Sequence, residues 1–353
     1  MRKKQDFVVK GKQVFVGLED SKRTWKLCVR SERMVVHETS MPTEYDNLRS
    51  YLQGRYPGCT VRVMYEAGFA GFWLHDLLVA DGIECVVTPA HMVIQEKVNK
   101  VKTDKIDARR LAKNLENGDY VVCHIPDRER REDRQISRTL NGVQRKIVST
   151  KNQIRRFLDF HGLNNHLPAG PWSESRYHEV RHLRLSVSFQ ISLDAYLEIL
   201  EHLQVVKSKL LVVLKGLCDK DRYHRSVQIK QSCSGVGWLS AIRFTLEWGK
   251  MSRFKDGQRL ASFVGLTSRE YSTGETIRRG RITGQGNDQV RAWLIQCAWR
   301  AIRLDPVLLD KFNRVWKNSG SKKKAIVATA RKLAIRMRAI ELADQEYCVG
   351  VIQ

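Results

Sequence analysis

The sequence has few acidic residues for its size, no long apolar run and no recognisable leader segment. Its 353 residues include 62 Lys and Arg but only 38 Asp and Glu. No apolar stretch approaches the ~20 residues that a membrane-spanning helix needs. Residues 1–7 are too polar for the apolar core of a secretory signal. We therefore expect neither a membrane protein nor a secreted one.

The cysteines are also informative by their spacing. None of the eight forms a Cys-x-x-Cys pair; they lie singly at positions 28, 59, 85, 123, 218, 233, 297 and 348. This scatter argues against a zinc site and against a disulfide framework, and it favours a protein of the reducing cytoplasm.

The excess of basic residues is concentrated toward the C-terminus. The net charge is +24. Residues 1–200 carry 33 basic and 25 acidic side chains, whereas residues 201–353 carry 29 and 13. A strongly positive region attracts polyanions, and nucleic acid is the usual one. The alternative is a solvated basic surface without a specific partner.

Residues 1–127 have the pattern of an α/β domain. Runs of β-type residues predict strands at 13–18, 24–30, 34–38, 61–65 and 84–88. Helices are predicted at 45–56, 72–80 and 104–115, the last of them capped by Thr103. Three strands followed by alternating helix and strand is the order of an RNase H-like domain.

The rest of the chain is predicted to be α-helical. In residues 128–222, apolar residues keep an a/d spacing over 136–157 and again over 193–217. This pattern fits an antiparallel helical arm and equally a dimerising coiled coil. Residues 223–353 predict a basic, mostly helical domain, with a strong helix at 325–340 that carries several cations. Those cations are Arg331, Lys332, Arg336 and Arg338.

Four acids of the first domain are candidate metal ligands. Glu19 and Glu66 end predicted strands, and Asp104 and Asp107 lie one helical turn apart. Converging carboxylates hold Mg²⁺ or Mn²⁺, and two such ions support phosphodiester chemistry. Taken singly, each acid is better explained by solvation or helix capping. The neighbouring Lys102, Lys105, Arg109 and Arg110 would suit a phosphate substrate.

Two glycine-rich segments lie in the C-terminal domain. Ser234-Gly-Val-Gly237 resembles the hairpin of a helix-hairpin-helix, whose backbone N–H groups approach DNA phosphates, although an ordinary tight turn is as good an explanation. Residues 263–287 combine glycines, arginines and hydroxyls. A loop that brings a hydroxyl nucleophile to phosphate would need that mixture. A DNA-binding loop without chemistry, or a solvated hairpin, is the alternative.

Together these segments resemble the transposases of the IS110/IS1111 insertion-sequence family over nearly the whole chain. The most specific blocks are Lys102-Thr-Asp-Lys-Ile-Asp-Ala108 and Gly280-Arg-Ile-Thr283 with Gly286-Asn287. Supporting blocks are Val16-Gly-Leu-Glu19, Tyr65-Glu-Ala-Gly68, Val86-Val-Thr-Pro89, Gly235-Val-Gly237, Val264-Gly-Leu-Thr267, Tyr271-Ser-Thr-Gly274 and Val327-Ala-Thr-Ala-Arg-Lys-Leu333.

The resemblance implies a RuvC-like first domain with a D-E-D-D metal site, and a transposase domain with a serine nucleophile that forms a phosphoserine with DNA. It implies Mg²⁺, DNA, a structured guide RNA and a homo-oligomer, dimeric or tetrameric, in the bacterial cytoplasm near the nucleoid. The metal ligands would be Glu19, Glu66, Asp104 and Asp107, and the nucleophile Ser272. The nucleic-acid-binding residues would be Gly235, Gly237, Arg278, Arg279, Arg281 and Asn287.

Two positions depart from the family pattern. The first acid is usually Asp, whereas here Glu19 precedes Asp20, and adjacent strand residues face opposite ways. The family serine directly precedes a glycine, whereas here Thr273 holds that place after Ser272. We favour Glu19 and Ser272, with Asp20 and Thr273 as the alternatives. A RuvC-like nuclease with a water nucleophile, a non-catalytic nucleic-acid binder and an inactive copy are the competing functions.

Overall fold

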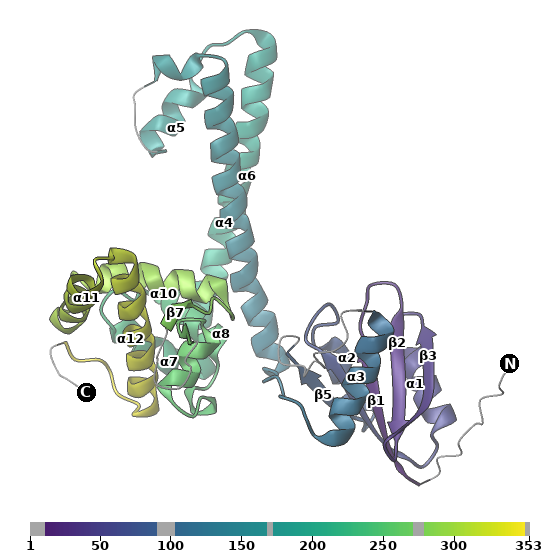
Figure 1. Cartoon of the computed structure of the whole chain (residues 1–353). Helices are drawn as coiled ribbons and strands as arrows, with labels where there is room; N and C mark the ends of the chain where they lie inside the picture. The colour runs from purple at the N-terminus through teal and green to yellow at the C-terminus, as the bar shows by residue number, and fades with distance from the viewer. Residues whose placement is uncertain (1–10, 90–102, 168–171, 271–278, 350–353) are drawn as a thin grey trace. The chain divides into compact units, whose positions relative to one another are not determined.

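A computed structural model describes residues 11–89, 103–167, 172–270 and 279–349, and within these ranges the side chains of residues 165, 166 and 279 are not described. The chain divides into two compact units, residues 1–125 and 126–353 (Figure 1). The predicted boundary between the helical arm and the C-terminal domain therefore falls inside the second unit.

The first unit is built on a five-stranded sheet with the order β3-β2-β1-β4-β5. The strands are β1 (Gln13–Glu19), β2 (Trp25–Ser31), β3 (Met34–Met41), β4 (Thr60–Glu66) and β5 (Glu84–Thr88). The first three strands are antiparallel, whereas β4 runs parallel to β1 and β5 runs parallel to β4. All five strands were predicted within a few residues, and this mixed sheet is consistent with an RNase H-like domain.

Helices cover both faces of this sheet. The helices α1 (Tyr45–Arg55) and α2 (Trp73–Ala80) pack through their leucines on the face that carries Val14, Val16 and Leu18. The helix α3 (Asp104–Asn117) lies on the opposite face (Figure 1). It begins at the predicted cap, because Thr103 Oγ1 accepts a hydrogen bond from the N–H of Ile106 at 3.4 Å.

The second unit starts with two long helices, α4 (Arg128–Phe160) and α6 (Val187–Cys218), that pack side by side (Figure 1). The predicted stripes face each other: Ile147 and Ile154 of α4 share a buried cluster with Leu193, Leu197 and Leu200 of α6. A short α5 (Glu174–Arg181) and a 3₁₀ turn at Leu163–His166 complete this arm. The arm pairs within one chain, which fits the predicted antiparallel alternative.

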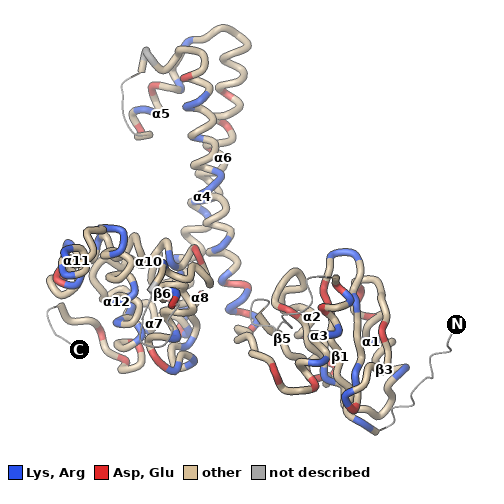
Figure 2. Tube along the Cα trace, viewed as in Figure 1, with Lys and Arg blue, Asp and Glu red and all other residues tan. Residues whose placement is uncertain are grey.

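The C-terminal domain packs further helices around one large apolar core. They are α7 (Asp221–Ser232), α8 (Trp238–Trp248), α9 (Gly257–Phe263), α10 (Asp288–Ala301), α11 (Pro306–Ser319) and α12 (Lys322–Leu342). A two-stranded ribbon, β6 (Ser268–Glu270) with β7 (Arg279–Ile282), interrupts the helices. Figure 2 shows Lys and Arg along α11 and α12.

Candidate active site and nucleic-acid interface

The two predicted strand-end acids lie on neighbouring parallel strands. Leu18 of β1 is in register with Tyr65 of β4, so Glu19 and Glu66 follow at adjacent positions. Phe15 and Met64, on the same strands, pack against α3. Because side chains alternate along a strand, Glu19 and Glu66 point to this same face of the sheet.

The helix α3 brings the other two acids toward the same end. A Cβ on Gly17 would lie 2.2 Å from the carbonyl oxygen of Ala108, so α3 rests directly on β1 at this glycine. Leu115 packs near Phe15, which precedes Gly17 along β1, so α3 runs against the direction of β1. Its first turn, with Asp104 and Asp107, therefore lies toward the strand end that carries Glu19.

The acids share an end and a face but do not form a closed cluster. Within the described ranges, no three Asp, Glu, His or Cys side chains lie close enough to hold a metal ion. Asp107 is 3% exposed and forms an ion pair with Arg110 at 2.8 Å, whereas Asp104 is exposed. The four-ligand site thus stays a prediction, and a bound cation would have to displace Arg110 from Asp107.

The alternative first ligand has a different environment. One carboxylate oxygen of Asp20 accepts a hydrogen bond from Trp25 Nε1 at 2.9 Å, and the other accepts one from the backbone N–H of Ala70. Trp25 and Ala70 belong to the core on the α1–α2 side of the sheet. Asp20 therefore has a structural role there, which favours Glu19 as the acid that faces α3.

Sequence reasoning missed an acid on β3. Glu38 accepts hydrogen bonds from Arg109, one of them at 2.8 Å, and pairs with Lys105 at 3.3 Å. The hydrogen bond from Arg109 holds the pKa of Glu38 below its ordinary value. Two of the cations that we expected to meet a phosphate, Lys105 and Arg109, thus share one partner in Glu38, and Arg110 pairs with Asp107. Lys102 lies outside the described residues. Glu38 lies opposite Cys28 of β2, a pairing between strands that the local sequence does not show.

The predicted nucleophile belongs to the segment between β6 and β7. Ser272, Thr273 and Arg278 lie outside the described residues, as does the side chain of Arg279. The two stems of this hairpin are fixed by glycines: a Cβ on Gly265 would meet the carbonyl oxygen of Gln285 at 1.9 Å, and one on Gly286 would meet that of Phe263 at 2.2 Å. These contacts show that the two stems approach each other at backbone contact distance. Both glycines also have positive φ, which favours glycine at these positions.

The helices α7 and α8 are joined by the glycine turn, which fits both the predicted helix-hairpin-helix and the alternative of an ordinary tight turn. Its two glycines differ. Gly235 has a φ of 83°, and a Cβ there would meet the backbone of Ala301 and Cys297 at 2.6 Å, which gives this glycine a packing role. Gly237 caps α8 and has open space at its Cβ position, so of the two it is the one with room for a phosphate.

Asn287 is bound within the protein. Its side-chain oxygen caps α10 by accepting from the N–H groups of Gln289 and Val290, and its amide donates to Glu247 at 3.2 Å. Glu247 is buried and also pairs with Arg138 of α4 at 2.9 Å. The residue therefore has a structural role that we did not expect, and its predicted contact with nucleic acid stays a prediction.

Comparison with known proteins finds two family profiles and several relatives. The profile of the IS116/IS110/IS902 transposase family matches residues 228–313, and the DEDD transposase profile of IS110 type matches residues 16–162. Two proteins of Sinorhizobium fredii, y4qE and y4rJ, both named as putative transposases, are 28% and 27% identical. The alignments cover 67% of this chain and 57% of y4qE, and 92% of this chain and 90% of y4rJ.

A further relative is the transposase of insertion element IS1111A from Coxiella burnetii, which is 24% identical over 83% of this chain and 80% of its own length. Both profiles are of transposases, and all three relatives carry the name transposase. The chain belongs to the IS110/IS116 family of insertion-sequence transposases. Such a family implies DNA as substrate and, through the DEDD domain, a divalent metal ion. Across the described helices, none is long and apolar enough to cross a membrane.

Proposed function

We propose that this chain cuts and rejoins DNA through a phosphoserine intermediate, with Ser272 as nucleophile and Thr273 as the alternative. The observation that supports it most is the placement of Glu19, Glu66 and the first turn of α3 at one end and one face of the sheet. The close backbone contacts of Gly265 and Gly286 add support. They hold in place the strands β6 and β7, which flank the segment that contains Ser272 and Thr273.

In this reaction the serine oxygen attacks the phosphorus of a phosphodiester, and the bond to a deoxyribose oxygen breaks. The serine proton passes to solvent or to a neighbouring carboxylate, and the departing deoxyribose oxygen takes up a proton. A second strand then reverses the exchange by attacking the phosphoserine with its own hydroxyl. Arg278, Arg279 and Arg281 would stabilise the charge of the pentacoordinate phosphate.

Glu19, Glu66, Asp104 and Asp107 would hold the metal, and their hard oxygens suit Mg²⁺ or Mn²⁺. When bound, such an ion polarises the scissile phosphate and stabilises the leaving oxygen. A guide RNA, a homo-oligomer formed through the arm and association with the nucleoid complete the proposal, and they come from the family resemblance alone.

A covalent adduct tests the chemistry directly. The whole chain is incubated with DNA of its element's end junction, the flanking non-coding RNA and Mg²⁺, and the products are separated on a denaturing gel. We expect a protein–DNA adduct that disappears in Ser272→Ala and Glu66→Ala and persists in Thr273→Ala. Asp20→Asn, which alters an acid on the other face of the sheet, is the matched control for Glu19→Gln, and only Glu19→Gln should abolish the adduct.

Other outcomes separate the alternatives. An adduct that persists in Ser272→Ala and disappears in Thr273→Ala would move the nucleophile by one residue. Cleavage without an adduct would overturn the phosphoserine step in favour of a water nucleophile. Binding without cleavage, with or without Mg²⁺, would leave a nucleic-acid binder or an inactive copy.

A further inference from the structure

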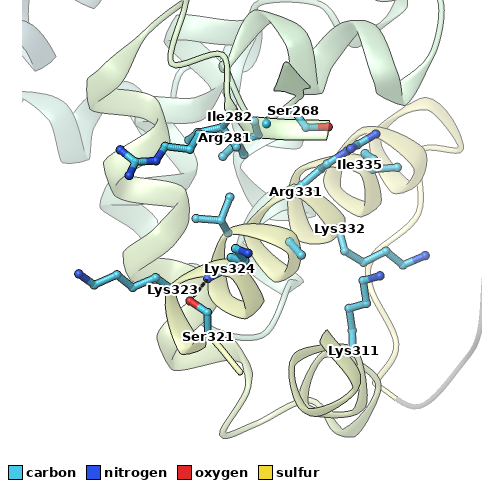
Figure 3. Close-up of a pocket in the computed structure, with 14 residues that line it drawn as sticks. Ser268, Arg281, Ile282, Lys311, Ser321, Lys323, Lys324, Arg331, Lys332 and Ile335 are labelled. Carbon is cyan, nitrogen blue, oxygen red and sulfur yellow. Dashed lines mark hydrogen bonds between the residues drawn. The ribbon is translucent and has the colours of Figure 1, made fainter. Parts of the chain in front are cut away.

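A basic groove lies in the C-terminal domain between the β6–β7 hairpin and the helices α11 and α12 (Figure 3). Its volume is about 860 Å³. Six cations line it, and no acid is among its described lining residues. The cations are Arg281, Lys311, Lys323, Lys324, Arg331 and Lys332.

These cations differ from the other basic residues of α12. Arg336 pairs with the buried Asp305 at 2.6 Å, and Arg338 donates to backbone carbonyls. In contrast, none of the six groove cations forms an ion pair with a carboxylate in the part of the chain that the structure describes; Arg331 donates only to the amide oxygen of Gln258. Clustered like charges repel one another, so the groove gains stability when an anion enters it.

The floor of the groove is apolar and small. Val327, Ala328 and Ile335 of α12 lie opposite Leu266 and Ile282. Figure 3 shows Arg281 and Lys323 reaching out on one side of the groove and Lys311 and Lys332 on the other. Apolar side chains between cations suit a sugar–phosphate chain, in which each sugar lies between two charged phosphates.

We infer that this groove binds the phosphodiester backbone of a DNA strand next to the paired strands β6 and β7. The assignment of the strand as DNA rests on the proposed function. The comparison with RNA tests it, because Ser268 and Ser321 also line the groove and can hydrogen-bond a 2′-hydroxyl. Arg281 belongs to both β7 and the groove, so a strand held here passes directly to the base of the hairpin.

The test compares two double variants of the whole chain. Lys324→Gln with Lys332→Gln removes two charges from the groove. Lys317→Gln with Lys322→Gln removes two charges outside the groove, one from α11 and one from α12. Binding to a fluorescent DNA duplex, and to an RNA duplex of the same sequence, is measured by anisotropy at several salt concentrations.

We expect the groove variant to bind all DNA sequences more weakly and to lower the slope of log K against log[salt] by about 2, roughly 1 for each lost phosphate contact. The control variant should keep the slope of the unmodified chain. Equal losses of DNA affinity in both variants would refute the groove as the binding site, because general surface charge would then explain the binding. A loss confined to the RNA duplex would overturn the assignment to DNA.

This measurement is independent of the adduct. A chain that forms no adduct, and yet loses DNA affinity only in the groove variant, would refute the phosphoserine proposal and uphold the groove. An adduct, together with DNA affinity that is unchanged in the groove variant, would uphold the phosphoserine proposal and refute the groove.

Discussion

Replacing Gly17 by alanine should push α3 away from the sheet. The new Cβ would lie 2.2 Å from the carbonyl oxygen of Ala108 and 2.3 Å from the amide nitrogen of Ala112, both backbone atoms of one rigid helix. Relief from 2.2 Å to the 3.4 Å of an ordinary contact requires a shift of about 1.2 Å. Such a shift loosens the packing of Leu111 and Leu115, so we expect a cost of about 3 kcal/mol, at the upper end for overpacking.

At roughly 4 °C per kcal/mol for a domain of this size, that cost lowers the melting temperature of the first unit by about 12 °C. Calorimetry of the whole chain measures the transition, and hydrogen exchange of α3 amides shows whether this helix loosens first. Gly54→Ala is the matched control: this glycine lies in α1 with open space at its Cβ position, and alanine there should stabilise by about 0.5–1 kcal/mol. Unchanged stability of Gly17→Ala would refute the close approach of α3 to β1.

Two further predictions concern contacts that the sequence did not reveal. The pKa of Glu38 lies below its ordinary value of 4.5, so its stabilising effect is complete above pH 4.5 and is lost as the pH falls through the lowered pKa. Urea unfolding on both sides of pH 4.5 should therefore show a weaker acid dependence for Glu38→Gln than for the unmodified chain; equal dependence would contradict the pairing with Arg109. Asn287→Ala removes a helix cap and a donor to the buried Glu247, and should cost about 2 kcal/mol in chemical unfolding, against less than ~1 kcal/mol for the exposed neighbour Asp288→Ala.

The sequence was sufficient for the strands and helices of the first unit and for the long helices of the arm, because their periodicity is local; the strands β6 and β7 lie in a segment that was expected to be a loop. Strand ends, the Thr103 cap and the facing stripes of the arm all follow from residues close together in the chain. The sequence of elements along the chain indicated an RNase H-like domain, whereas the order of the strands within the sheet came from the structure. Glu19 and Glu66 could be placed at strand ends in advance, and their register confirms that they lie on adjacent parallel strands.

Contacts between distant segments could not be predicted in this way. The sequence of α12 identifies Arg331, Lys332, Arg336 and Arg338 as one basic set, but only the packed structure separates the two that line the groove from the two that bind within the core. Lys311 joins the groove from α11, with no local signal of its own. The run Ser321-Lys-Lys-Lys324 was the one visible hint, because it places two groove lysines at the start of α12.

In this chain we expect substitutions at the closely packed glycines to lower stability, and substitutions at the candidate reactive residues to lower activity alone. Gly17 lies two residues before Glu19, and Gly265 lies three before Ser268, where the β6–β7 hairpin begins. At Gly17 and Gly265 a Cβ would meet backbone, so substitution there disturbs the fold. Glu19 sits at a strand end and is only half-buried, so replacing it by glutamine changes charge with little change in packing. An inactive Gly17 variant should therefore melt early, whereas an inactive Glu19→Gln variant should melt normally, and this difference separates loss of the frame from loss of the chemistry.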